Sequence, residues 1–178
     1  YLYNYCNEPW KTQELARKHV RINYKNSPDG VNGNDDCGQM SAWYLFSAMG
    51  FYPVTPGSNE FAIGAPQLPE IKIQLKDHEL TIKADNLSEE NQYVQSVFLD
   101  GKKLLKPFIN YFDLIGAKEL RFIMGNKQTV YKETKVQHDF TIIYQSIRGY
   151  FTNKKVPSYL FVKKLIYCPI LIIREFYN

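Results

Sequence analysis

The stretch that most constrains the fold of this chain is Val31–Tyr44, which reads VNGNDDCGQMSAWY. Gly33 and Gly38 allow backbone angles that other residues rarely adopt, which is typical of a tight loop. From residue 38 to residue 49 apolar side chains occupy every side of a helix, and Gly50 then ends it. The stretch therefore predicts a tight loop that leads directly into a buried helix within a helical assembly.

Two adjacent carboxylates, Asp35 and Asp36, lie in the loop half of this stretch. One interpretation is capping, because Asp36 followed three residues later by Gln39 fits a capping box, and a carboxylate near a helix N-terminus gains roughly 0.3–1 kcal/mol. The other interpretation is catalysis, because one acid suffices to cap. A carboxylate kept ionised by helix amides suits a general base that deprotonates water. The residues alone leave both interpretations open.

The segment GNDDCGQMSAWY, continued by FSAMGFYPV from Phe46, resembles the signature of glycoside hydrolase family 92, the calcium-dependent exo-acting α-mannosidases. The similarity extends upstream through YLYNY and PWKTQEL and downstream through Ile63-Gly64 and QYVQS, so that it covers residues 1 to about 127. Because members of that family are much longer, the resemblance implies that this chain is the C-terminal piece of such an enzyme. It also favours the catalytic interpretation of the acid pair.

The resemblance implies a glycosidase that removes terminal α-linked mannose from N-glycans or mannans with inversion, secreted, periplasmic or at the cell surface in its full-length form. The general-base role then falls on the acid pair, and we predict Asp36 as the base with Asp35 as its helper; the reverse order is the alternative. Asn34 and Gln39 are predicted to orient the base or bind substrate, or to serve only the turn and cap. Trp10 is predicted either to line a sugar site or to pack in the interior.

The resemblance also implies what this chain lacks. The family's glutamate acid and the Asn-Glu-Pro-Ser-His segment that binds sugar and calcium would lie upstream of Tyr1, with most calcium ligands. An EF-hand over Asp29–Met40 is excluded, because its twelfth position needs an acid and holds Met40. We therefore expect the chain alone to hydrolyse no mannoside. Its expected partners are a mannose-containing glycan and the missing N-terminal part of the enzyme.

The predicted fold class is α+β, with three regions. Residues 1–53 are expected to form the last helices of an (α/α)₆ barrel, and residues 54–127 an antiparallel, sandwich-like β region. Residues 128–178 are expected to be an atypical tail. Period-two alternation and turn signals predict the strands Phe61–Ile63, Ile71–Leu75, Leu80–Ala84, Tyr93–Leu99, Lys102–Leu105 and Leu120–Met124, with a type I′ hairpin at Asp100-Gly101.

Burial is also predicted from these patterns. Pro9 is placed to open a helix that runs to about Tyr24, with His19 as a hydrogen-bonded histidine on its core face. That face is predicted to hold Leu15, Ala16, His19, Val20 and Asn23. Without the rest of the barrel, Trp43, Phe46 and Phe51 are predicted to be exposed and to favour association.

The distribution of charges, cysteines and apolar residues argues against nucleic-acid binding, a zinc site and a membrane span. The net charge is +4, but residues 1–127 hold 14 Lys and Arg against 15 Asp and Glu, so no basic groove for nucleic acid is expected on the main body. The three cysteines lack zinc-site spacing, and Cys37 is predicted to fill the core. The longest apolar run, Tyr167–Ile173, is too short to span a membrane.

The alternative function is a non-catalytic carbohydrate-binding or structural β module. Such a module would need exposed aromatic side chains on its sheet, for which Tyr93, Phe98 and Phe122 are the candidates.

Overall fold

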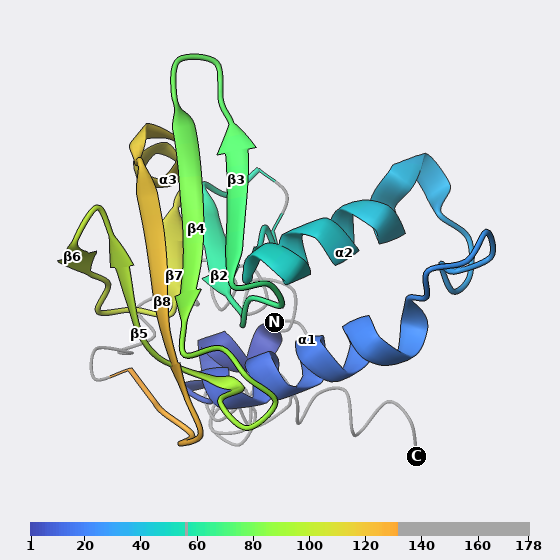
Figure 1. The fold of residues 1–178 in the computed structure, drawn as a ribbon, viewed down its shortest axis with the longest axis horizontal. Helices are drawn as coiled ribbons and strands as arrows, with labels where there is room; N and C mark the ends of the chain where they lie inside the picture. Colours follow the sequence, from blue (N-terminus) through green and yellow to red (C-terminus); the bar gives the residue numbers. More distant parts are fainter. Residues whose placement is uncertain (56, 132–178) are drawn as a thin grey trace, which may run out of the picture. The chain divides into compact units, whose positions relative to one another are not determined.

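The computed structural model describes residues 1–55 and 57–131, which belong to the compact unit Tyr1–Thr134. Predictions about residues 132–178 lie outside the described part of the chain, and the region boundaries at residues 53 and 127 stay predictions. Helices and strands are both present, which confirms the α+β class (Figure 1). The helical elements are η1 (Leu2–Cys6), α1 (Pro9–Asn23), η2 (Asp36–Gly38), α2 (Gln39–Met49) and α3 (Tyr111–Gly116).

Helix α1 begins at Pro9, as predicted, because proline suits the first turn, where its missing N–H leaves no hydrogen bond unmade. Its buried face differs from the predicted one and consists of Pro9, Thr12, Gln13, Ala16, Arg17 and Val20. His19 is exposed, and its Nδ1 lies 3.3 Å from the Asn23 side-chain nitrogen, so the prediction of a core histidine is wrong. Polar side chains occupy part of the buried face of α1, because the Gln13 side chain accepts a hydrogen bond from the buried Val94 amide.

Helix α2 ends at Gly50, which adopts a left-handed φ of 93° and whose amide donates to the Phe46 and Ser47 carbonyls. The predicted burial on all sides is wrong for the described residues, because Ser47 and Ala48 are the residues of α2 that are buried. Leu45 has 59% of its surface exposed.

The strands form two sheets. The five-stranded sheet has the order β3-β4-β8-β5-β6, and the three-stranded sheet has the order β1-β2-β7. Their bounds are β1 (Phe51–Tyr52), β2 (Glu60–Ile63), β3 (Glu70–Gln74), β4 (Glu79–Asp85), β5 (Tyr93–Leu99), β6 (Lys102–Lys103), β7 (Phe108–Asn110) and β8 (Glu119–Gly125).

The prediction of a purely antiparallel region is wrong in one place, because β8 pairs parallel to β4 while it pairs antiparallel to β5. Strand β8 therefore enters the middle of the sheet, between two strands that precede it in the chain. The hairpin prediction is confirmed: Asp100 and Gly101 both have positive φ, at 46° and 78°, as a type I′ turn requires, and Leu99 pairs with Lys102.

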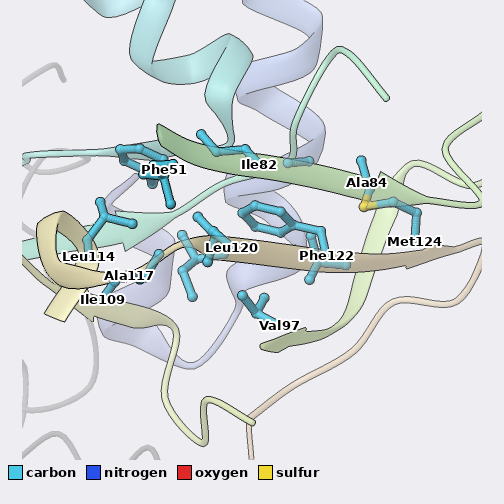
Figure 2. Packing of buried hydrophobic residues seen from close by; sticks show 14 residues of the cluster. Phe51, Ile82, Ala84, Val97, Ile109, Leu114, Ala117, Leu120, Phe122 and Met124 are labelled. Atoms are coloured by element: carbon cyan, nitrogen blue, oxygen red, sulfur yellow. The ribbon is translucent and has the colours of Figure 1, made fainter. Parts of the chain in front are cut away.

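Both sheets share one hydrophobic core, whose side chains gather around Leu120 and Phe122 of β8 (Figure 2). The prediction that Phe51 is exposed is wrong, because only 2% of its surface is accessible. Its ring packs against Phe46 and Phe61, with centroids 5.9 and 5.4 Å away. Phe46 and Trp43 are half-buried, so they fall between the predicted and the buried state. The C-terminal end of α2 is thus anchored in the core of the sheets.

Candidate active site

The loop between α1 and α2 lies at the end of these helices that is remote from the sheets (Figure 1). It begins with a β-turn over Ser27–Gly30, in which the Gly30 amide donates to the Ser27 carbonyl at 2.9 Å. The chain then returns to the end of α1, because Tyr24 and Val31 form an antiparallel bridge and the Asn32 amide donates to the Asn23 carbonyl at 3.2 Å. The acid pair follows directly, so its position is tied to the end of α1.

Asp35 binds the first turn of α2. Its Oδ1 accepts hydrogen bonds from the amides of Met40 at 2.7 Å and Ser41 at 3.0 Å, and its Oδ2 accepts one from the Ser41 hydroxyl at 2.5 Å. These bonds, first those from Ser41, lower the pKa of the Asp35 carboxyl below its ordinary value. Asp35 thus satisfies amides at the helix start that have no partner within the helix.

Asp36 is placed differently, so the predicted capping box of Asp36 with Gln39 is wrong. It opens the 3-10 turn η2, in which Cys37 and Gly38 adopt left-handed φ values of 54° and 73°. Those two residues delay the start of α2, so the Asp36 side chain does not reach the first amides of the helix. The Asp36 side chain is exposed, and no hydrogen bond or ion pair joins it to any residue in the ranges 1–55 and 57–131.

Of the other predicted site residues, Asn34 and Gln39 lie beside the acids and are exposed. Trp10 is half-buried at the opposite end of α1, about 20 Å along the helix axis from its C-terminus. There its ring centroid lies 5.1 Å from the Lys11 ammonium nitrogen. The structure therefore brings Asn34 and Gln39 together with the acid pair, but not Trp10. Cys37 is exposed, so its predicted role as a core filler is wrong.

Sequence analysis missed two residues that hold the acid loop. Ser41 lies inside the motif, and a hydroxyl on the first turn after an acid was the available signal. Tyr24 lies at the predicted end of α1, but nothing in the sequence shows that its hydroxyl donates to the Met40 carbonyl, 2.9 Å away and 16 residues later.

The acid pair is not part of a larger group of metal-binding side chains among the described residues. In the ranges 1–55 and 57–131, no three side chains of His, Cys, Asp or Glu come together in a group that could hold a metal ion. Calcium prefers six to eight oxygen ligands, which an isolated pair of carboxylates does not supply. Helices α1, α2 and α3 of the described part are also too short or too polar to cross a membrane.

The aromatic residues considered for a carbohydrate-binding sheet are mostly interior. Phe122 is fully buried, 8% of the surface of Tyr93 is exposed, and Phe98 is half-buried. The described sheets therefore offer no stacking surface built from these three residues.

Comparison with known proteins identifies relatives. Residues 1–126 match the family model described as the glycosyl hydrolase family 92 catalytic domain. The chain is 27% identical over 133 residues to an uncharacterized secreted glycosidase of Arthroderma benhamiae, an alignment that covers 72% of this chain and 17% of that protein.

Two solved structures from Bacteroides thetaiotaomicron are similar. The α-mannosidase BT3965, solved with mannoimidazole, is 45% identical with a TM-score of 0.66, over 70% of this chain and 17% of that one. The inverting mannosidase BT2199 is 34% identical with a TM-score of 0.64, over 70% of this chain and 17% of that one. This chain thus spans about a sixth of the length of these relatives. Since the family model covers more than half of its residues, the chain belongs to glycosyl hydrolase family 92.

Proposed function

We propose that this chain supplies the general-base segment of an inverting exo-α-mannosidase that acts on terminal α-linked mannose of N-glycans or mannans. Family membership supports a glycosidase, and the similarity to an α-mannosidase and to an inverting mannosidase supports the substrate and the stereochemistry. The similarity to a secreted glycosidase supports a secreted, periplasmic or cell-surface enzyme.

The observation that carries the proposal is the different state of the two neighbouring carboxylates. Asp35 uses three of its roughly four acceptor positions on Met40 and Ser41, which leaves it little capacity to take a proton from water. Asp36 lies next to it, exposed, with its oxygens free of partners among the described residues. Asp36 is therefore proposed as the base, and Asp35 as the residue that fixes its backbone.

In the proposed reaction Asp36 takes a proton from a water molecule, whose oxygen attacks the anomeric carbon of the mannose. The bond from that carbon to the departing oxygen breaks on the other face of the ring, and a general acid protonates this oxygen. In inverting glycosidases the two carboxyl groups lie about 6.5–9.5 Å apart, which leaves room for the water. Asn34 and Gln39, exposed beside the pair, are proposed to orient the base or contact the sugar.

The general acid and the calcium ligands are proposed to come from parts of the enzyme outside this chain. Helices α1 and α2 are proposed to be the last helices of an (α/α)₆ barrel, whose other helices would cover the exposed outer face of α2. The chain alone is then expected to turn over no α-mannoside, because acid catalysis contributes on the order of 10²–10⁴-fold.

The proposal can be tested in a chimera of the Bacteroides α-mannosidase BT3965 in which residues 1–126 of this chain replace the matching segment. We expect the parent chimera to hydrolyse an aryl α-mannoside and to release β-mannose first, as observed by ¹H NMR. Asp36→Asn should lower kcat by about 10²–10⁴-fold. Asp35→Asn should lower it less, and Asp29→Asn, the control in the preceding turn, should leave it unchanged.

The proposal would be refuted by an Asp36→Asn chimera as active as its parent, or by α-mannose as the first product.

A further inference from the structure

Tyr24 occupies the position at which the acid loop leaves α1. It is the first residue after the helix and has extended backbone angles, with φ −125° and ψ 134°. This conformation lets its backbone pair with Val31, the residue at which the chain returns from the Ser27–Gly30 turn. One end of the segment Asn32–Gly38, which carries both acids, is thus fastened to the backbone of Tyr24.

The side chain of Tyr24 fastens the other end of the same segment. Its hydroxyl donates to the Met40 carbonyl in the first turn of α2, at 2.9 Å. Its ring stacks on Trp43 with centroids 5.9 Å apart and planes 10° apart, and it contacts the Tyr44 ring at 4.9 Å. Three residues of the first turns of α2 therefore contact the side chain of Tyr24.

The bonds of Tyr24 and of Asp35 converge on the same turn of helix. Met40 offers its carbonyl to Tyr24 and its amide to Asp35. Burial, and after it the negative charge of Asp35, raises the pKa of Tyr24. A displacement of Met40 relative to Tyr24 would therefore also displace the amides that hold Asp35.

We infer that Tyr24 is a positioning residue for the proposed base, which it serves by holding both ends of Asn32–Gly38 and hence the backbone of Asp36. The inference rests on the proposed function. Two kinds of interaction hold Asn32–Gly38 in place: the hydrogen bond from the Tyr24 hydroxyl to the Met40 carbonyl, and the contacts of the Tyr24 ring with Trp43 and Tyr44. They can be separated, because phenylalanine keeps the ring and removes the hydroxyl.

The first test uses the 178-residue chain and the variant Tyr24→Phe, with Tyr111→Phe as the control. Tyr111 is also a partly exposed tyrosine, but it lies in α3 and not at the acid loop. In Tyr24→Phe we expect amide hydrogen exchange at Met40 and Ser41 to rise about 2- to 10-fold, the factor expected for one net hydrogen bond. The ¹³C carboxyl titration of Asp35 should move up toward its ordinary value, while exchange at Ala48 stays unchanged.

The second test places Tyr24→Phe in the mannosidase chimera. A positioning residue should lower kcat about 2- to 10-fold and leave KM unchanged, because it acts on the base and not on the bound sugar. Tyr24→Leu, which also loses the ring stacking, should lower kcat further.

The inference is overturned if Tyr24→Phe leaves the exchange at Met40 and Ser41 and the titration of Asp35 as in the parent chain. It is also overturned if exchange rises equally along α2, which indicates general destabilisation. If Asp36→Asn leaves the chimera active, the proposed function fails, yet the exchange and titration data still decide whether Tyr24 fixes the loop.

Discussion

At the residue scale, two identical side chains behave differently because of their backbone positions. Asp35 precedes the turn η2 and reaches the amides of Met40 and Ser41, whereas Asp36 begins that turn and faces solvent. Because three donors stabilise the ionised form of Asp35, its pKa is lower in the folded chain than in the unfolded one. The stability that this carboxylate contributes is therefore complete above the ordinary aspartate pKa. It is lost as the pH falls through the lowered pKa.

We predict that Ser41→Ala raises the pKa of Asp35, because the hydroxyl of Ser41 is the first cause of its depression. The variant should be less stable than the parent chain at neutral pH, and the difference should disappear in acid, once Asp35 is protonated in both. Urea unfolding across this pH range measures the difference. Ser58→Ala, which removes another exposed serine hydroxyl, is the control and should show no such pH dependence. A Ser41→Ala deficit that persists undiminished in acid would contradict the prediction.

The sequence predicted an acid pair at the start of a helix, and its capping interpretation placed the cap on Asp36, whereas Asp35 binds the first amides of the helix. The capping-box pattern assumes that the helix starts directly after its cap. Left-handed Cys37 and Gly38 insert an extra turn, and a left-handed cysteine is not visible in a sequence pattern. Asp35, and not Asp36, therefore binds the first amides of α2.

At the scale of elements, local signals predicted the strands well and their partners poorly. Alternation and turn residues depend on neighbours in sequence, so β2 to β6, β8 and the Asp100-Gly101 hairpin were found. The parallel pairing of β8 with β4 depends on residues about 40 positions apart. A pattern of neighbouring residues contains no information on such distant pairs. The short strands β1 and β7 and helix α3 were missed, since two, three and six residues give too few periods to recognise.

The junction of α2 and β1 provides a prediction at this scale. We predict that Gly50→Ala lowers the free energy of unfolding by about 2 kcal/mol or more, because alanine is strained at φ 93° and its Cβ would lie 2.9 Å from Pro66 and 3.1 Å from the buried Phe122 ring. Chemical denaturation measures the change. Gly116→Ala in α3 is the matched control, because its added Cβ would meet no atom within 4 Å. Equal stability of the two variants would contradict the strain at Gly50.

At the scale of the whole molecule, the described residues hold one buried core and a helix α2 that is exposed on one side. The side chains around Leu120 and Phe122 are fully buried, whereas the outer face of α2 exposes Tyr44 and Leu45. The sequence predicted that this helix needs cover on all sides, and its hydrophobicity still indicates so. It also predicted exposed aromatic residues on this helix without the rest of the barrel; of these, Trp43 and Phe46 are half-buried. The aligned part of this chain covers 17% of BT3965, so that relative has far more chain from which to build such a cover.

We predict that the isolated chain self-associates through the outer face of α2, because exposed apolar patches favour association. Leu45→Lys should shift the chain toward the monomer in sedimentation velocity at fixed concentration. Leu68→Lys, at a residue that is 52% exposed in a loop, should have little effect. A parent chain that stays monomeric at every concentration tested would contradict this prediction.

The central position of β8 also determines when the five-stranded sheet can form during synthesis of the chain. Strands β4 and β5 leave the ribosome first, yet neither has its inner neighbour until Glu119–Gly125 is synthesised. Until then their facing edges stay unpaired and open to other chains, which is the state in which nascent β-structure aggregates. A chain interrupted before Glu119 would therefore be left with two separate strand pairs, β3-β4 and β5-β6, in place of one five-stranded sheet.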